Sequence, residues 1–449
     1  MNNWGIVGIG RIGLSMARNM SDKGISLSLY DKIFENKSDP ILEEKKLYPE
    51  LKKVSVFNDI LNFIESIERP RKILILVPSG NPNEQVISKL ITILSDNDII
   101  IDAGNTNPLI SYRNKLKIAK NNILYLGIGV SGGTQGVLEG PSIMIGGDNS
   151  AFKKVKDDLS LITSKTIENS KSYDFFGDSN QGHFVKMIHN GIEYVEMQLI
   201  ASIYKLLFDS NNYNNQSIAQ IFEDWNNNLN SYLIDISTQK ILEKIDDKYL
   251  LEKIDDVAED NGTGRWMLNY GVELGCSLSM LSSAMDTRFI SKLQSERNEI
   301  NKNIKQSSKK YKVDVNSLKS AYKFCSLVNF IQAFCLINAA NKTYNWNISI
   351  SKVLNVWSNG SIIKSSLIND LYSNYSVENI LSDKKIIKDL NHCKSDVINI
   401  IMLSLKNDIS IPCFNDALNY FNSISSNSLS TKMIQAQRNF FGSHSIKIK

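Results

Sequence analysis

The sequence predicts an α/β domain over residues 1–178, then an all-helical domain over 179–431 and a C-terminal tail over 432–449. Three observations support this division. Short apolar runs closed by glycine, proline, asparagine or serine recur in the first part, as is typical of buried parallel strands. From about Ser179 to Asn427, large apolar residues recur instead at three- and four-residue steps, which is the helical period. A chain of 449 residues should also form two or three domains.

The composition is typical of a globular, soluble chain. It is 42% hydrophobic and 22% charged, and no segment reaches the 18 consecutive apolar residues of a membrane span. Residues 1–20 enter a strand and a glycine loop where a signal peptide would have its apolar core. We therefore expect a cytoplasmic protein with no membrane partner. The net charge of +4 is not gathered into a basic stripe with interleaved aromatic residues, so we expect no nucleic-acid partner.

The five cysteines are odd in number and lack C-x-x-C spacing, which argues against a disulfide framework or a zinc site. We interpret them as reduced core residues and expect no metal. They are Cys276, Cys325, Cys335, Cys393 and Cys413.

The first predicted element is an apolar run over residues 4–9, which leads into G-x-G-x-x-G at 8–13 and a helical pattern through Met20. In this strand-to-helix setting the glycines permit a tight turn, the approach of a pyrophosphate and close packing of helix on strand. The motif therefore predicts a Rossmann-type dinucleotide-binding domain. Its expected cofactor contacts are Gly8, Ile9, Gly10, Arg11, Ile12 and Gly13.

The second predicted strand, residues 26–30, ends at Asp31, where an acid would bind the adenosine ribose of NAD. Lys32 follows directly and could instead meet the 2′-phosphate of NADP. Ile33 completes this group of expected cofactor contacts. The local chemistry leaves the choice between NAD and NADP open.

Further strands are predicted at residues 73–77, 99–102 and 124–128. In a parallel sheet the ligand crevice lies at the carboxyl ends of the strands. The loops after these strands therefore supply further expected contacts. They are Val77, Pro78 and Ser79 for the cofactor, Asn105 for cofactor and substrate, and Ser131 for the substrate.

The segment 127–147 contains eight glycines. Backbone with so few side chains can bring N–H groups against a bound carboxylate. A flexible surface loop is the alternative interpretation. Strands on both sides favour an ordered binding loop.

The segment 182–194 predicts a helix with an unusual polar face. Lys186, His189, Asn190, Glu193 and Tyr194 stand at i, i+3, i+4, i+7 and i+8, while apolar side chains occupy the opposite side. A solvated helix face is the simpler interpretation. In a cleft, however, a lysine and a glutamate two turns apart could act as an acid/base pair.

These motifs together resemble those of the 6-phosphogluconate dehydrogenases, decarboxylating enzymes of the pentose phosphate pathway. The resemblance covers nearly the whole chain, and H-N-G-I-E-Y after the lysine is specific to this family among β-hydroxyacid dehydrogenases. The matching segments are the glycine motif at 8–13, D-A-G-N-T at 102–106, V-S-G-G…G-P-S at 130–142, G-H-F-V-K-M-I-H-N-G-I-E-Y at 182–194, G-T-G-R-W at 262–266 and Q-R-N-F-F-G-S-H at 437–444.

The resemblance implies oxidative decarboxylation of 6-phosphogluconate to ribulose 5-phosphate and CO₂, with reduction of NADP or NAD. Lys186 would be the general base for the C3 hydroxyl group, and Glu193 the acid that protonates C1. Protonated Lys186 would stabilise the enolate without a metal. The implied substrate contacts are Asn105, Ser131, Gly132, Gly133, His189, Asn190, Tyr194, Arg265, Arg288, Arg438 and His444.

The resemblance also implies a homodimer in which the tail of one subunit brings Arg438 and His444 to the phosphate site of the other. NADP-dependent members usually have Asn-Arg at the positions of Asp31 and Lys32. Family membership thus favours NADP slightly, whereas the acid favours NAD. Arg265 replaces a usual lysine and keeps the charge.

Two alternative functions stay open at this point. A non-decarboxylating β-hydroxyacid dehydrogenase acting on a smaller acid would share the domain plan, but four candidate phosphate ligands and the long helical domain argue against it. A nucleotide-binding regulatory protein that has lost catalysis would not need Lys186 and Glu193, and both are present.

Overall fold

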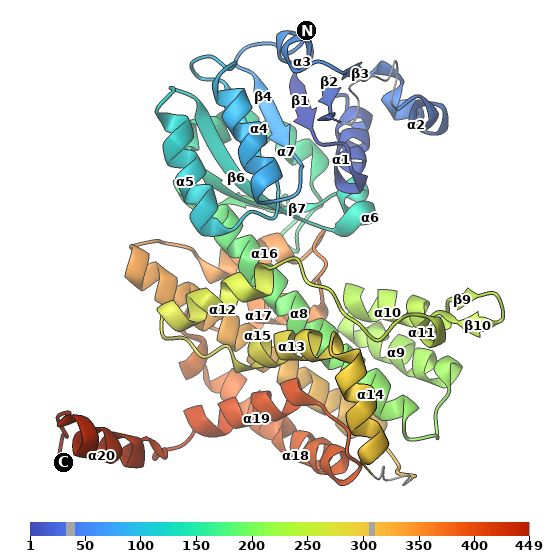
Figure 1. The fold of residues 1–449 in the computed structure, drawn as a ribbon, viewed down its shortest axis with the longest axis vertical. Helices are drawn as coiled ribbons and strands as arrows, with labels where there is room; N and C mark the ends of the chain where they lie inside the picture. Colours follow the sequence, from blue (N-terminus) through green and yellow to red (C-terminus); the bar gives the residue numbers. More distant parts are fainter. Residues whose placement is uncertain (33–40, 305–309, 449) are drawn as a thin grey trace.

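The computed structural model describes residues 1–32, 41–304 and 310–448. Ile33, one of the expected cofactor contacts, lies outside these ranges. An α/β part stands on a larger helical part, and helix α8 (Gln181–Phe208) runs from the sheet into the centre of the helical part (Figure 1). The predicted fold class is confirmed.

One sheet of eight strands, in the order β3-β2-β1-β4-β5-β6-β7-β8, forms the centre of the α/β part. Neighbouring strands are parallel except β6 and β7, which pair antiparallel with Ile128 opposite Ile145. The strands are β1 (Trp4–Val7), β2 (Leu27–Tyr30), β3 (Ser55–Phe57), β4 (Lys72–Ile75), β5 (Ile99–Asp102), β6 (Leu124–Ser131), β7 (Ser142–Gly147) and β8 (Tyr173–Phe175).

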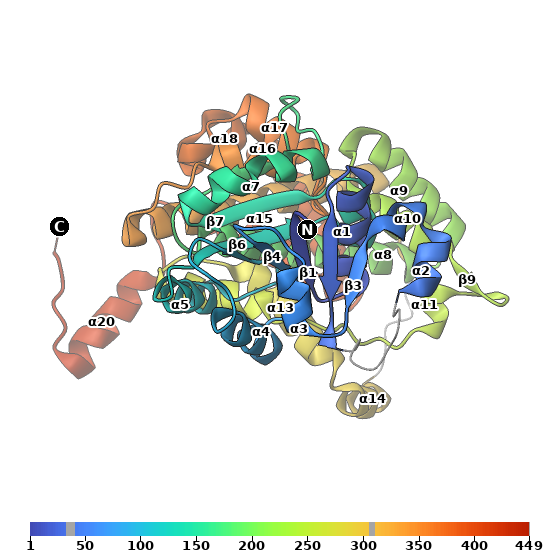
Figure 2. The ribbon, with the colours of Figure 1, turned by 90° about the horizontal axis from the view of Figure 1, so that it is seen from above.

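Helices cover both faces of this sheet, as seen from above in Figure 2. Met16, Ala17 and Val155 belong to an apolar core that α1 and α7 form on one face. Phe63 and Leu90 belong to a second core on the other face, which α3, α4 and α5 cover. These helices are α1 (Arg11–Asp22), α3 (Ile60–Glu65), α4 (Asn81–Ile91), α5 (Pro108–Ala119) and α7 (Asn149–Ile162).

The remaining elements of the α/β part are short, and the helical part follows β8. The short elements are α2 (Leu42–Leu47), η2 (Pro49–Lys53) and α6 (Gly133–Glu139). The helical part comprises α8, α9 (Asn215–Leu229), α10 (Tyr232–Leu242), α11 (Leu250–Lys253), α12 (Thr263–Glu273), α13 (Ser279–Ser291), α14 (Gln294–Asn303), α15 (Val315–Tyr344), α16 (Ile350–Trp357), α17 (Ser366–Asn374), η3 (Val377–Ser382), α18 (Lys384–Lys406), α19 (Pro412–Ile424) and α20 (Thr431–Gly442). A small hairpin, β9 (Lys244–Ile245) with β10 (Lys248–Tyr249), interrupts the helices.

The glycine-rich segment 127–147 is not the loop that the sequence predicts. It contains the end of β6, helix α6 and strand β7. Some of these glycines let α8 pack against the sheet, because a Cβ atom on Gly129 would lie 2.1 Å from the Cβ of Lys186. A Cβ on Gly146 would likewise lie 2.6 Å from the backbone nitrogen of Gly182.

The polar face of α8 is not solvated, and the simpler interpretation of the 182–194 motif is wrong. Lys186, His189 and Asn190 are all at most 5% exposed, as buried as the apolar residues on the opposite side. The helix therefore has protein around nearly its whole circumference. Its reactive side chains lie in the junction between sheet and helices, where burial shifts their pKa values.

Helix α15 is the one helix, among the residues described, that is long and apolar enough to cross a membrane. It is a core helix, since 78% of its most apolar window is buried inside the protein. It begins at the cap residue Asp314, which accepts a hydrogen bond from the Asn316 N–H, and it ends at Asn345 in the left-handed conformation.

The tail forms helix α20, which projects away from the rest of the chain in both views (Figures 1 and 2). None of its residues is buried, and Phe440 and Phe441 are 93% and 74% exposed. Two adjacent aromatic rings in water lose the stabilisation that burial would give them.

Candidate active site

The turn between β1 and α1 has the geometry that a dinucleotide pyrophosphate needs. Gly8 has a φ of +98°, and a Cβ on Gly13 would lie 2.0 Å from the carbonyl oxygen of Gly8. Gly10 is the N-cap of α1, and a Cβ there would meet nothing within 4 Å. Free backbone N–H groups therefore face open space at the helix N-terminus, and this arrangement fits a dinucleotide.

Asp31 lies beside this turn at the end of β2. Its Oδ2 accepts a hydrogen bond of 2.8 Å from the backbone N–H of Ile9, which ties the carboxylate to the glycine turn. Lys32 is exposed. Asp31 and the exposed Lys32 after it thus stand next to the glycine turn, and their contacts with a ribose remain a prediction.

The loops after β4 and β5 lie at the same edge of the sheet. Val77, Pro78 and Ser79 lead to Gly80, which is the N-cap of α4 and has a φ of +86°. In the next loop Asn105 is exposed, while Asp102 is fully buried and accepts hydrogen bonds from the backbone N–H of Gly104 and the hydroxyl of Thr106. Asp102 therefore fixes the loop that presents Asn105.

His189 is the centre of a buried polar cluster, which we name the catalytic cluster after the role that the sequence predicts for Lys186 and Glu193. Its Nδ1 lies 3.4 Å from the Lys186 amine, 3.1 Å from Asn190 Oδ1 and 3.7 Å from Glu193 Oε2. Its Nε2 lies 2.8 Å from the hydroxyl of Ser131. One imidazole ring therefore contacts four of the predicted site residues.

Burial changes the protonation of these groups. It lowers the pKa of Lys186 to about 8, against a smaller opposing effect of the Glu193 charge. Burial also raises the pKa of Glu193, and the charges of Lys186 and Arg288 partly offset this rise. Burial and the nearby Lys186 amine hold the pKa of His189 well below its usual range, so the ring is neutral. A lysine and a glutamate whose pKa values approach each other can exchange roles as acid and base.

A cationic corner lies one turn further along α8. The Arg288 guanidinium group stacks 4.3 Å above the Tyr194 ring and is only 5% exposed. Its hydrogen bonds within the described chain go to the Ala284 carbonyl group and the Met197 thioether, and no carboxylate there forms a salt bridge with it, although Glu193 and Asp260 are close enough to interact with its charge. Arg265 is more exposed and pairs with Asp260 at 2.7 Å. This corner can accept a dianion.

Sequence reasoning missed the loop between α16 and α17. Ser361 Oγ lies 2.8 Å from His189 Nε2, and the Ile362 N–H donates to Ser131 Oγ over 3.1 Å. Gly360 permits this approach with a φ of +69°, and a Cβ there would lie 2.4 Å from the Gly140 carbonyl oxygen. The only local signal is the small polar run from Ser358 to Ser361, which marks a loop but not a contact with His189, 172 residues away.

Two predicted substrate contacts do not reach this cluster within one chain. Arg438 and His444 belong to the projecting tail, where Arg438 lies 3.4 Å from Gln435 and the His444 carbonyl group accepts from Asn439. In residues 1–32, 41–304 and 310–448, no three His, Cys, Asp or Glu side chains are placed to hold a metal ion.

A chain of buried hydrogen bonds connects α8 to the Asn105 loop. His183 Nδ1 lies 2.8 Å from Ser111 Oγ, which lies 3.0 Å from the Tyr125 hydroxyl. That hydroxyl donates to Asp102 Oδ2 over 3.2 Å. His183 precedes Lys186 by one turn, so this chain of hydrogen bonds connects the part of α8 that carries Lys186 to the loop that carries Asn105.

Replacing Tyr125 by phenylalanine should lower kcat roughly fivefold, because one buried hydrogen bond of about 1 kcal/mol that aligns the two elements is lost. Steady-state kinetics and thermal unfolding would measure this effect. Tyr112→Phe, on the exposed side of α5, is the control. A lower melting temperature with unchanged kcat would show that the chain of hydrogen bonds is only structural.

Two family models match nearly the whole chain. The NAD binding domain of 6-phosphogluconate dehydrogenase matches residues 3–170, and the 6-phosphogluconate dehydrogenase C-terminal domain matches residues 182–449. The chain belongs to the 6-phosphogluconate dehydrogenase family. The predicted family and the predicted class of enzyme are therefore confirmed.

Individual relatives agree with this assignment. The chain is 34% identical to the decarboxylating 6-phosphogluconate dehydrogenase of Staphylococcus epidermidis (strain RP62A) over 99% of this chain and 96% of the relative. The enzyme of the same name from Staphylococcus aureus (strain N315) is 33% identical with the same coverage.

Solved structures give the same result. The 6-phosphogluconate dehydrogenase of Plasmodium falciparum superposes with a TM-score of 0.90 at 29% identity, over 100% of this chain and 98% of that one. The 3-hydroxyisobutyrate dehydrogenase of Salmonella typhimurium has a TM-score of 0.51 at 16% identity and covers 66% of this chain and 95% of its own. The second likeness shows a shared fold only.

Proposed function

We propose that this enzyme decarboxylates 6-phosphogluconate oxidatively to ribulose 5-phosphate and CO₂, with Lys186 as general base and Glu193 as general acid. The observation that carries this proposal is the buried cluster of Lys186, His189 and Glu193, in which burial moves the lysine and glutamate pKa values toward each other. The bound nicotinamide cofactor supplies the acceptor for the hydride that leaves C3.

In the first step Lys186, unprotonated, takes the proton of the C3 hydroxyl group. The product is a 3-keto acid, whose carboxylate lies β to the new carbonyl group and can leave as CO₂. Lys186 now carries the proton, and its ammonium group beside the C3 oxygen stabilises the developing enolate. Glu193, whose pKa is raised by burial, then protonates the carbon that has lost CO₂, which is C2 of the substrate and becomes C1 of ribulose 5-phosphate.

The remaining contacts orient the substrate. Neutral His189, held by Ser131 and Asn190, lies next to Lys186 and would position the substrate hydroxyl groups. Ser131, with the backbone of Gly132 and Gly133, would hold the C1 carboxylate. The phosphate would lie in the cationic corner, whose proposed ligands are Tyr194, Arg265, Arg288 and, from the partner's tail, Arg438 and His444.

A homodimer follows from the same proposal. Within one chain the cationic corner lacks Arg438 and His444, while the tail that carries them extends into solvent with two exposed aromatic rings. Exchange of the two tails between two subunits would bury both rings of each tail and complete both phosphate sites. We place the enzyme in the cytoplasm.

The experiment that tests the function is the initial rate with 6-phosphogluconate, measured with NADP and NAD side by side and with CO₂ release recorded. Reduced cofactor and CO₂ should appear in equal amounts. Reduction without CO₂ would support the alternative, a dehydrogenase of smaller β-hydroxyacids. That alternative is not favoured, because the relatives that match the full chain are decarboxylating enzymes.

We propose NADP as the preferred cofactor, by a small margin. The Plasmodium falciparum relative was solved with its cofactor NADP⁺, and Lys32 offers an exposed charge to a 2′-phosphate. Asp31 opposes this choice, because its carboxylate would repel the phosphate and can accept hydrogen bonds from a ribose.

Asp31→Asn should shift the NADP/NAD ratio of kcat/KM about five- to thirtyfold toward NADP, or roughly 1–2 kcal/mol. The amide oxygen can still accept from the Ile9 N–H, so the glycine turn should keep its shape. Asp22→Asn, at the exposed end of α1, is the matched control. An unchanged ratio would show that Asp31 does not face the ribose.

The acidic limb of the kcat/KM profile should have its midpoint near pH 8, the pKa of Lys186, and fall about tenfold per pH unit below it. The base is inactive when protonated, so activity is lost as the pH falls. In Glu193→Gln the residual activity should show a lower midpoint, because the Glu193 charge raises the lysine pKa. If the midpoint of Glu193→Gln were unchanged or higher, the Glu193 charge would not act on the pKa of Lys186.

A further inference from the structure

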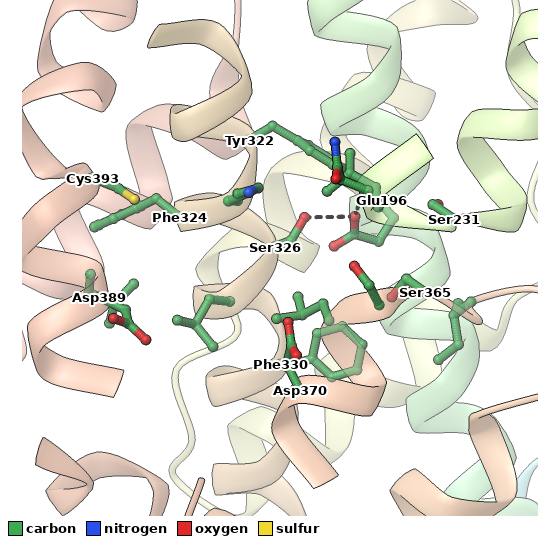
Figure 3. Close-up of a pocket in the computed structure, with 18 of the residues that line it drawn as sticks. Glu196, Ser231, Tyr322, Phe324, Ser326, Phe330, Ser365, Asp370, Asp389 and Cys393 are labelled. Atoms are coloured by element: carbon green, nitrogen blue, oxygen red, sulfur yellow. Dashed lines mark hydrogen bonds between the residues drawn. The ribbon is translucent and has the colours of Figure 1, made fainter. Parts of the chain in front are cut away.

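A cavity of about 480 Å³ lies in the helical part, on the side of α8 that faces α10, α15 and α17 (Figure 3). We name it the rear cavity. Its walls are largely apolar and include Leu229, Leu233, Leu327, Phe330 and Ile363. Its volume is within the range of sites that hold small organic molecules, which combine apolar walls with a few polar groups.

Glu196 is the polar group at the centre of this cavity, and Figure 3 shows its carboxylate among Ser326, Ser231 and Ser365. It is 7% exposed. Its Oε2 accepts hydrogen bonds of 2.9 Å from the hydroxyl groups of Tyr322 and Ser326, and its Oε1 accepts one of 3.0 Å from Asn329.

All three donors are neutral, and no ion pair joins Glu196 to a cation within the described ranges of the chain. Burial raises the pKa of this carboxyl group. A buried carboxylate is costly unless a cation pairs with it, and one lone pair of Oε1 can still accept a further donor. The missing partner is therefore a positive charge inside the cavity.

The other charged side chains of the lining are also mostly negative. Asp370 and Asp389 line the rear cavity together with Glu196, against one ammonium group, that of Lys323. His392 is also part of the lining. A ligand that carries a positive charge and an apolar body matches both the carboxylates and the walls, whereas an anion would be repelled.

The rear cavity shares two elements with the catalytic cluster. Glu196 follows Glu193 by one turn on α8, and Asn329 donates to both the Ile192 carbonyl group and Glu196. At the start of the segment 361–367, the Ser361 hydroxyl forms a hydrogen bond with His189. Further along the same segment, Ile363 and Ser365 line the cavity. A ligand that pushes this segment would therefore move a direct neighbour of His189.

We propose that the rear cavity is a second ligand site, which binds a small organic cation with an apolar body through Glu196 and changes kcat when it is filled. The binding step is independent of the function proposed above, because it can be measured without turnover. No residue of the catalytic cluster takes part in it.

The test uses the full-length enzyme and three probes of similar size that share a phenyl group on a short chain: 2-phenylethylamine, which is a cation, neutral 3-phenylpropanol and anionic 3-phenylpropionate. Calorimetry or ligand-observed NMR should give saturable binding of the amine, with a Kd on the order of 1 mM, as usual for so small a ligand. The propionate should bind at least tenfold more weakly. Saturating 6-phosphogluconate should not displace the amine.

Glu196→Gln should weaken amine binding about tenfold, on the scale of one charged hydrogen bond. Glu243→Gln, at an exposed glutamate of the same part, should leave the affinity unchanged. If the first variant fails to fold, Ser365→Phe supplies the answer by filling the cavity while Glu196 stays in place. Amine binding that survives Ser365→Phe, or a propionate that binds as tightly as the amine, would overturn the site.

The coupling has its own readout. The amine should change kcat at saturating cofactor and substrate in the parent enzyme, and the same amine should have no effect on kcat in Ser365→Phe. Saturable binding without any change in kcat would overturn the coupling, and displacement by 6-phosphogluconate would place the amine in the active site instead.

Discussion

Lys186→Met should lower kcat by about 10²- to 10⁴-fold, the usual contribution of a positioned general base, while cofactor binding is retained. Methionine has a similar length and keeps the contact with Gly129, so the packing of α8 on the sheet should survive. Steady-state rates and a fluorescence titration with the reduced cofactor would measure the two effects. Near-normal turnover in this variant would exclude Lys186 as the base.

The same substitution should make the protein more stable. The pKa of Lys186 falls from 10.5 to about 8 on folding, so the unfolded chain binds the proton more tightly. Burial of the amine therefore costs about 3 kcal/mol at neutral pH, and this cost disappears as the pH rises from 8 toward 10.5. Thermal unfolding at pH 7 should show a higher melting temperature for Lys186→Met.

Lys205→Met is the matched control, because this lysine lies on the same helix but is exposed and pairs with Asp209 at 2.6 Å. It should change neither turnover nor, beyond about 0.5 kcal/mol, stability. A Lys186→Met variant that is more stable but has normal turnover would support the energetic cost of burying the amine and exclude Lys186 as the general base.

Deletion of residues 432–449 should nearly abolish substrate use, since the phosphate site would lose Arg438 and His444. The glycine turn and Asp31 lie in the α/β part, so binding of the cofactor should remain. Kinetics with 6-phosphogluconate and a separate cofactor titration would distinguish the two sites. The expected loss is large, because each arginine at a phosphate site contributes charge-assisted hydrogen bonds to substrate binding.

A mixed dimer decides whether the tail acts across subunits. One chain carrying Lys186→Met and one lacking 432–449 should together regain one working site of two, because one pocket has its own lysine and the partner's tail. Each parent alone should be inactive. Mixed dimers verified by mass that stay inactive would count against tail exchange.

The sequence by itself determined the local chemistry and the fold class. The G-x-G-x-x-G turn, the strand before it and the helical spacing of Lys186, His189, Asn190 and Glu193 depend on residues within a few turns of one another, where steric and periodic rules operate. The strand that ends at Asp102 is found with the predicted bounds for the same reason.

Only the tertiary structure decided which of these groups are buried and what surrounds them. From its sequence, the polar face of α8 could lie in solvent or in a cleft. Packing of α8 against β6 and α15 buries this face. Burial, not sequence spacing, moves the pKa of Lys186 to about 8. The eight glycines of 127–147 resemble a binding loop locally, yet Gly129 and Gly146 are required by a helix about 40 to 60 residues later in the chain.

Ser361 and Glu196 show the same limit. Ser361 reaches His189 across 172 positions, and the donors of Glu196 come from α15, more than 120 residues away. No local pattern records such pairs, because they arise when separate helices pack and each buried polar atom must find a partner. The tail is the extreme case, since nothing in the described part of the chain covers its two aromatic rings.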